Sequence, residues 1–213
     1  MMSQTHILVA SALLARPHKP LRNTAVLLGA FLPDAAIYSL FAWSKLRGIP
    51  ENKVWDELYW QEPWQSYTAA GNSIFVYLVL LLIGLVALRN AAAAHRIGLF
   101  LTFLALAALT HLAGDLPVHV DDAHRHLWPL SDWKFVSPIS YWDPDHHGRW
   151  FMLFEFVFSA FLCVLLFRRF QSWWVRVPLL MMLAAYVAAS SPRLKLKDGM
   201  SLGIMEIAFN SDC

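Results

Sequence analysis

Cysteine is scarce in this chain, and its placement excludes two kinds of structure. Cys163 lies inside an apolar segment and Cys213 is far from it, and neither belongs to a CxxC pair. A disulfide framework and a thiolate zinc site are therefore not expected. The sequence also has no glycine-rich phosphate loop and no histidine close to Cys163, which argues against an amidotransferase of cofactor biosynthesis.

Charged residues are also few. They make up 15% of the 213 residues, whereas hydrophobic residues make up 58%, and an average soluble domain has about 25% charged residues. This composition predicts a single integral membrane domain over residues 1–213. The net charge of +2 is small, and the basic residues gather at the ends of apolar segments, so a nucleic-acid partner is not expected.

The apolar runs predict an all-α fold, a polytopic membrane helical bundle of about five spans. The expected spans are residues 24–43, 74–88, 97–113, 150–167 and 175–190. Residues 5–15 are too short to cross a bilayer, which needs about 20 residues, and are predicted to form an N-terminal half-helix. Most of the ten tryptophans lie at the ends of these runs or in the loops beside them, as expected for a membrane interface. Residues 115–149 are predicted to form an ordered loop, rich in His, Asp and Trp, that acts as a polar cap.

Histidines and acids are concentrated in residues 110–149. His111 and Asp115 lie one helical turn apart at the end of an apolar run, so both side chains project from the same face. Pro117 is predicted to end or kink that helix. Imidazoles and carboxylates then follow in close succession: His119, Asp121, Asp122, His124 and His126. This ligand set suits zinc and other first-row divalent ions; a merely solvated connection between membrane segments is the alternative.

Two further ionisable residues lie in apolar segments nearer the N-terminus. His6 lies in the predicted half-helix, and Asp34 follows Pro33 inside an apparent span. A proline frees a backbone carbonyl and a carboxylate is expensive in lipid, so this segment is expected to face a polar cavity. A kinked helix with an internally satisfied acid is the alternative. Together with His111 and Asp115, these residues come from three apolar segments, which helix packing could gather around one metal ion.

Four short motifs follow one another along the chain. They are His6, LLGAFLPD at residues 27–34, HLAGD at residues 111–115 and WPLS at residues 128–131. In this order and spacing they resemble the bacterial inner-membrane metal-dependent hydrolases typified by the LexA-regulated membrane hydrolase family. The resemblance implies an integral protein of the bacterial inner (cytoplasmic) membrane, a divalent metal ion with zinc as first choice, and a phosphoester or lipid-like substrate.

One position departs from the pattern of that family. Where the family has Thr-His-Ser before a span, this chain has Asn72 followed by Ser73. Asparagine binds hard ions through oxygen but is a poor zinc ligand. The metal site is then altered, lost, or completed by His119, His124 or His126, and His119 is the fifth residue that we predict as a ligand.

Two acids are candidates for proton transfer. Glu155, a turn inside the span 150–167, is a candidate general base or partner of a ligating histidine, with a snorkelling interfacial acid as the alternative. Asp122 is the second catalytic candidate. The sequence leaves two functions open: a membrane-bound metal-dependent hydrolase with a lipid or small-molecule substrate, or a non-catalytic scaffold or accessory subunit that binds partners through its Trp-rich loops. Transport is disfavoured because few polar residues lie within the spans.

Overall fold

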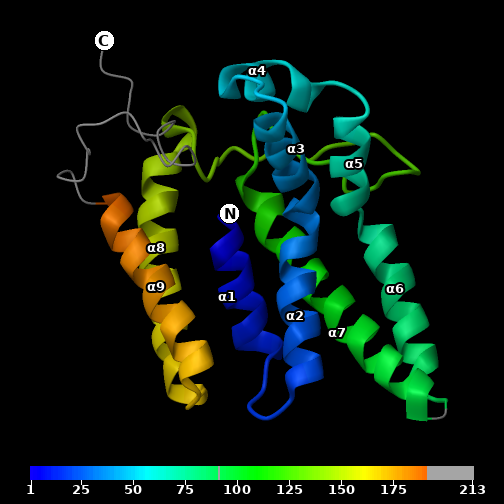
Figure 1. The fold of residues 1–213 in the computed structure, drawn as a ribbon. Helices are drawn as coiled ribbons and strands as arrows, with labels where there is room; N and C mark the ends of the chain where they lie inside the picture. The colour runs from blue at the N-terminus through cyan, green and yellow to red at the C-terminus, as the bar shows by residue number, and fades with distance from the viewer. Residues whose placement is uncertain (91, 191–213) are drawn as a thin grey trace. The chain divides into compact units, whose positions relative to one another are not determined.

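The computed structural model describes residues 1–90 and 92–190, and these residues form helices, turns and loops without a strand (Figure 1). The helices are α1 (Ser3–Leu14), α2 (Pro20–Phe31), α3 (Ala35–Leu46), α4 (Glu51–Asp56), α5 (Trp64–Gly71), α6 (Ile74–Ala87), α7 (Ala92–Asp115), α8 (Gly148–Arg169) and α9 (Trp173–Ser190). Short 3-10 turns are η1 (Leu32–Asp34), η2 (Leu58–Trp60), η3 (Leu116–Val118) and η4 (Pro144–His146). The predicted all-α class is confirmed for the described residues.

The chain divides into two compact units, Met1–Ser137 and Pro138–Cys213. The division falls inside the predicted polar cap, so the residues of that cap belong to both units. The first unit holds α1 to α7 and the second holds α8 and α9. A single domain over residues 1–213 stays a prediction.

Three helical segments of the described chain are long and apolar enough to cross a membrane: Pro20–Leu46, Ala94–Val118 and Gly148–Arg169. A fourth is obtained if α5 and α6, which are bent by 44°, count as one span. The predicted count of about five spans is not confirmed. The 14 residues of α6 extend for about 21 Å, less than a hydrocarbon core of about 30 Å. In α9 the structure has only a shorter apolar helix, and α1, with 12 residues, matches the predicted half-helix.

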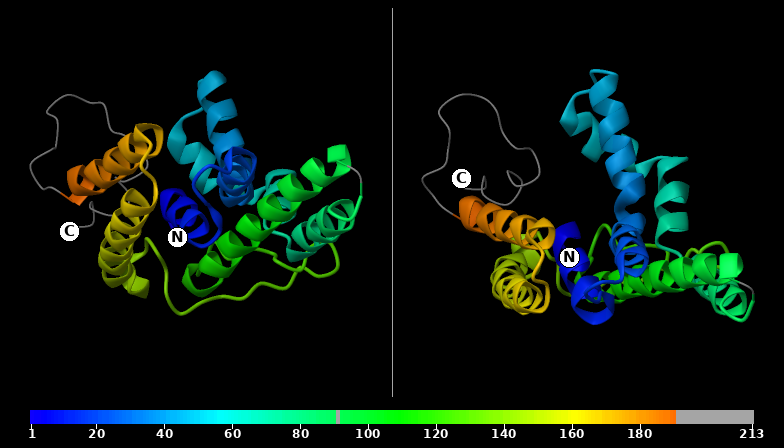
Figure 2. Two further views of the ribbon diagram at one scale, coloured as in Figure 1. Left: turned by 90° about the horizontal axis from the view of Figure 1, so that it is seen from below. Right: turned by 60° about the horizontal axis from the view of Figure 1, so that its bottom comes forward.

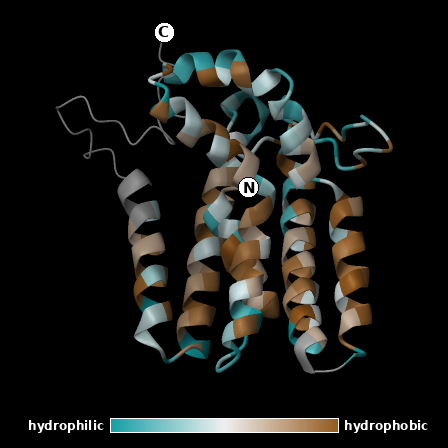
Figure 3. Cartoon of the chain, turned by 45° about the vertical axis from the view of Figure 1, so that its right-hand side comes forward, coloured by the Kyte–Doolittle hydropathy of each residue, from teal (hydrophilic) through white to brown (hydrophobic). Residues whose placement is uncertain are grey.

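Large apolar side chains cover the outside of α6. Those that are about half exposed are Leu78, Val79, Leu82, Ile83, Leu85 and Val86, and the helix is almost uniformly hydrophobic in Figure 3. The segment that contains α4 shows more hydrophilic residues in the same view. Lipid chains solvate a continuous apolar surface of this kind better than water does.

The first unit is built around α7, which packs against α1, α2 and α6 (Figure 2). Small residues at the crossings let the backbones approach closely, as is common between membrane helices. Gly29 of α2 lies against the backbone of Leu104, and Gly84 of α6 lies against Thr102. Buried alanines fill the crossing of α1, α2 and α7 together with Val26: Ala10, Ala30 and Ala107. This close packing brings polar residues of α1 and α2 within reach of those on α7.

Two prolines mark the places where the apolar helices break. α2 ends at Phe31, and Pro33 and Asp34 lie in the 3-10 turn η1 that leads into α3. α7 ends at Asp115, shortly before Pro117 in η3. Proline cannot donate a backbone hydrogen bond, so each break is expected where it occurs. Both prolines therefore place a carboxylate at a helix break inside or at the end of an apolar segment.

Candidate metal centre

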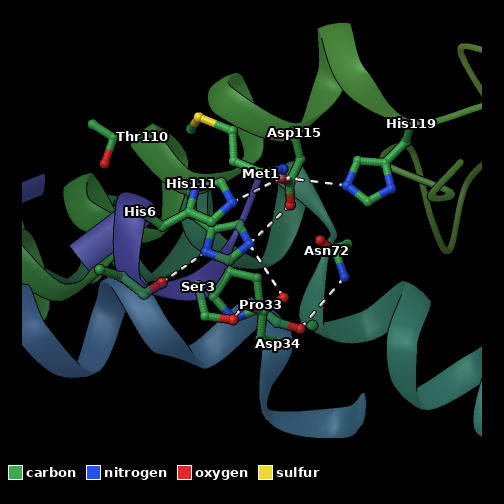
Figure 4. A network of polar contacts seen from close by, with 12 residues as sticks. Met1, Ser3, His6, Pro33, Asp34, Asn72, Thr110, His111, Asp115 and His119 are labelled. Atoms are coloured by element: carbon green, nitrogen blue, oxygen red, sulfur yellow. Dashed lines mark hydrogen bonds and ion pairs between the residues drawn. The ribbon is translucent and has the colours of Figure 1, made fainter. Parts of the chain in front are cut away.

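His6, Asp34, His111 and Asp115 lie together in the first unit, although they come from α1, η1 and α7 (Figure 4). The carboxylate of Asp115 is central. Its Oδ1 lies 2.8 Å from His6 Nε2, and its Oδ2 lies 2.9 Å from His111 Nε2. Asp34 Oδ1 lies 3.5 Å from the same His111 nitrogen. The structure thus brings together four of the five residues that the sequence predicts as metal ligands around one point.

The orientation of the two imidazoles is fixed by their surroundings. His111 Nδ1 lies 2.7 Å from the carbonyl oxygen of Ala30, to which it donates in the neutral ring, so the lone pair is on Nε2. The His6 ring stacks on that of His111 with centroids 3.5 Å apart and planes 9° apart. Gly114 leaves room for this stack, because a Cβ at this position would lie 3.3 Å from His6 Cε1. Both rings therefore present Nε2 to Asp115.

The cluster is almost inaccessible to solvent. His6 and His111 are each 1% exposed, and Asp115 is 2% exposed. A carboxylate buried to this extent needs positive charge or hydrogen-bond donors close by. The amino group of Met1 lies 2.5 Å from Asp115 Oδ1, and the Ser3 hydroxyl donates to Asp34 Oδ2 at 2.5 Å. Buried carboxylates beside neutral imidazoles form an environment that favours a divalent cation.

The loop after α7 adds a second group of ligand atoms around Asp115. His119 Nε2 lies 3.3 Å from Asp115 Oδ1, and His119 Nδ1 lies 3.0 Å from Asp122 Oδ2. The ligand atoms of Asp115, His119 and His124 all lie within 4.8 Å of one another. Burial opposes a charge on His119, but its hydrogen bonds with Asp115 and Asp122 outweigh burial and raise its pKa to about 9. Burial and the neighbouring His119 lower the pKa of His124, whose imidazole is therefore uncharged at neutral pH.

The loop histidines are buried and tied to the helices. His119, His124 and His126 are 7%, 6% and 4% exposed, so the alternative of a merely solvated connection is wrong for them. Two hydrogen bonds of His126 connect the loop to the junction between α5 and α6. Its Nδ1 lies 2.9 Å from the carbonyl oxygen of Asn72, and its own carbonyl accepts from the Ile74 amide at 3.0 Å. His126 thus holds the backbone of the loop and belongs to neither of the two ligand groups.

Asn72, which takes the place of a histidine in the family pattern, is part of the same buried region. It is 1% exposed, and its amide donates to the carbonyl oxygens of Thr68 at 3.0 Å and Pro33 at 3.4 Å. Its Oδ1 has no hydrogen-bond partner among the described residues. In Figure 4 its side chain lies between Asp34 and His119. An amide oxygen in this place can act as a hard neutral donor, although not as the imidazole that it replaces.

The two predicted catalytic acids have different surroundings. Asp122 contacts Nδ1 of His119, so its first effect is to orient that ring. Glu155 is 1% exposed within α8, and α8 belongs to the second unit. A catalytic role for either acid stays a prediction.

A pocket that the sequence did not indicate lies beside His124. Its lining includes two cations and two aromatic rings, contributed by Arg125, Lys134, Tyr59 and Trp60, together with Asp122 and His124. Arg125 Nη1 is paired with Asp132 Oδ1 at 3.0 Å, whereas the half-buried Lys134 forms no ion pair with any residue of 1–90 or 92–190. The two aromatic residues lie in η2, before α5, and the two cations lie in the loop after α7. Only the tertiary fold brings these segments together, so no local sequence pattern could have revealed the pocket.

Comparison of the chain with protein-family models, with curated proteins and with solved structures finds no match. Its function is therefore inferred from its own residues.

Proposed function

We propose that this chain is a membrane-bound hydrolase that depends on a divalent metal ion, with zinc as the preferred ion. The observation that carries the proposal is the buried carboxylate of Asp115, which lies 2.8 Å from an imidazole of α1 and 2.9 Å from an imidazole of α7. Histidine and carboxylate ligands, with the second histidine nitrogen bonded to a carbonyl, are typical of catalytic zinc sites. The resemblance of the same motifs to the LexA-regulated hydrolases supports this reaction class and a place in the bacterial inner membrane.

The residues of the chain position the ligands and the water. A bound divalent cation lowers the pKa of a coordinated water to about 7 and polarises the bond to be cleaved. The carbonyl oxygen of Ala30 keeps Nε2 of His111 directed at Asp115. Asn72 Oδ1, buried and without a hydrogen-bond partner among the described residues, is placed to orient a water or a substrate hydroxyl. Asp122 holds the His119 ring and can share its proton.

The pocket beside His124 supports an anionic substrate with an apolar part. Lys134 and Arg125 supply positive charge, and Tyr59 and Trp60 supply aromatic surface. Phosphate oxygens are recognised by such cations, and rings accommodate an acyl or aryl group. In its chemistry, this lining matches a phosphoester from a lipid or a small molecule.

Replacing His111 by Ala tests the metal-dependent function. We expect zinc in the detergent-purified protein to fall below about a tenth of the wild-type content, because a ligand at the centre of the site is removed. His95→Ala is the matched control, since His95 lies on the same helix but is exposed and bonded to the Leu88 carbonyl. Elemental analysis of both variants measures the effect. Full metal retention in the His111 variant would remove the proposal.

Lys134 is expected to act on substrate binding and not on metal binding. For Lys134→Met we predict that KM for a chromogenic aryl phosphodiester rises about tenfold, the effect of losing about 1.4 kcal/mol of binding, with metal content unchanged. Lys53→Met, at an exposed lysine of α4, is the control and should leave KM unaltered. Equal KM values for the two variants would contradict a role of the pocket.

A non-catalytic scaffold or accessory subunit is the second candidate. The observation that favours it is the exposure of aromatic residues in the loops, with Trp60 at 46% and Trp133 at 54%. Exposed tryptophans are common at protein interfaces. This function predicts a protein that is purified without metal and that folds normally after His111→Ala, so the same experiment separates the two candidates.

A further inference from the structure

Two groups of ligand atoms share one carboxylate in the first unit. One group is His6, His111 and Asp115, and the other is Asp115, His119 and His124. We infer that the site holds two divalent cations bridged by Asp115, with His119 and His124 as ligands of the second. The inference rests on the proposed metal-dependent function. It adds the number of ions in the metal centre and the ligands of the second ion.

The contacts of Asp115 suit a bridging carboxylate. Its Oδ2 faces His111, and its Oδ1 faces His119 at 3.3 Å as well as His6 at 2.8 Å. Oδ1 therefore contacts imidazoles of both groups, and Oδ2 contacts His111 of the first group. In two-metal hydrolytic sites the ions lie about 3.5–4 Å apart, a distance that one carboxylate spans with its two oxygens.

The separations between donor atoms also suit shared cations. Ligand atoms bound tetrahedrally at 2.0–2.1 Å from one zinc ion lie about 3.3 Å from each other. In the second group His119 Nε2 and Asp115 Oδ1 are 3.3 Å apart, and His111 Nε2 of the first group lies 3.5 Å from Oδ1 of Asp34, a residue outside both groups. Both distances exceed those of ordinary charge-assisted hydrogen bonds and fit two ligands of one ion.

Each group contains a histidine that is oriented in the same way. His111 Nδ1 is bonded to the Ala30 carbonyl at 2.7 Å, and His119 Nδ1 is bonded to Asp122 at 3.0 Å. In both rings Nε2 is left to face Asp115. A carboxylate or carbonyl behind a ligating histidine is the usual support of a metal ligand, because it fixes the tautomer and raises the basicity of the ring.

Charge and packing favour a second ion. Three carboxylates, those of Asp34, Asp115 and Asp122, contact the histidines of the cluster, so the cluster offers anionic ligands to more than one cation beside the Met1 amino group on Asp115 Oδ1. Two divalent cations make the centre positive, which attracts the anionic oxygen of a phosphoester from the pocket that His124 and Asp122 line. The rings of His119 and His124 lie 4.7 Å apart, close enough for one ion to bind a nitrogen of each.

Metal stoichiometry tests the inference on the full chain in detergent. The protein is loaded with Mn²⁺ or Zn²⁺, dialysed and analysed for metal. We expect about two ions per chain in the wild type and about one after His124→Ala. His95→Ala is the control, since His95 is an exposed histidine outside both groups, and it should keep both ions. Should His124→Ala fail to fold, His119→Gln makes the same test, with an amide left to face Asp122.

The outcomes separate this inference from the proposed function. One ion per chain that is lost with His111 but not with His124 overturns the second position and leaves the hydrolase proposal standing. No bound metal overturns both. With Mn²⁺, ions bridged by Asp115 are magnetically coupled, and we expect this coupling in the electron paramagnetic resonance spectrum of the wild type and not in that of Asp115→Asn. Two uncoupled ions in the wild type would refute the bridge.

Discussion

Asp115→Asn is expected to lose bound metal and hydrolytic activity together, each by at least about a hundredfold. Asp115 is the residue that touches every histidine of the first group and His119 of the second. Asparagine has the same shape but no charge, so α7 keeps its helix while the centre loses its anionic ligand. Metal affinity and turnover of an aryl phosphodiester, measured on the same preparation, report both losses.

Asp121→Asn provides the control for this prediction. Asp121 carries the same substitution in the neighbouring loop but is exposed, so metal content and activity should remain at the wild-type level. Retention of metal and activity by the Asp115 variant would show that the carboxylate serves only to pair the buried histidines. The assignment of Asp115 as the central metal ligand would then fail.

Gly29→Ala is expected to have the largest effect on the fold. A Cβ at this position would collide with the backbone carbonyl of Leu104 on α7, and backbone cannot yield as a side-chain end can. Alanine is the better helix former by about 1 kcal/mol, so any destabilisation must come from the crossing. We expect a loss of about 1–3 kcal/mol, or a fall of about 2–4 °C in Tm per kcal/mol, in thermal unfolding in detergent.

The same substitution should weaken the metal centre, because displacing α2 moves the Ala30 carbonyl away from His111 and shifts Asp34. Leu28→Ala is the control: Leu28 is the adjacent residue of α2 and is 49% exposed, so it should change Tm little and leave metal affinity intact. Equal stability of the two variants would show that the close crossing of α2 and α7 is not needed.

Helical periodicity and proline placement predicted the centre of the site well. The spacing of His111 and Asp115 fixes them on one face of α7, and their side chains are in contact in the structure. Pro117 was expected to end or kink its helix, and α7 ends at Asp115, two residues before it. In both cases the signal is local, since one turn of helix or one missing amide decides the result.

Features that depend on tertiary contacts could not be predicted in the same way. The apolar run of α6 is itself short, but nothing in the sequence shows the 44° bend that separates this helix from α5. The loop after α7 has no period, so sequence alone could not separate His124, which joins Asp115, from His126, which binds the Asn72 backbone. The pocket with Lys134 joins residues from segments far apart in the chain.

The central claim is that imidazoles and carboxylates of separate helices enclose a metal ion, and the X-ray absorption spectrum of zinc in the purified protein tests it most directly. The account predicts a coordination shell of nitrogen and oxygen at about 2.0–2.1 Å with the outer-shell scattering of imidazole, lost in Asp115→Asn. A sulfur shell at about 2.3 Å, or a protein that retains no zinc, would contradict it.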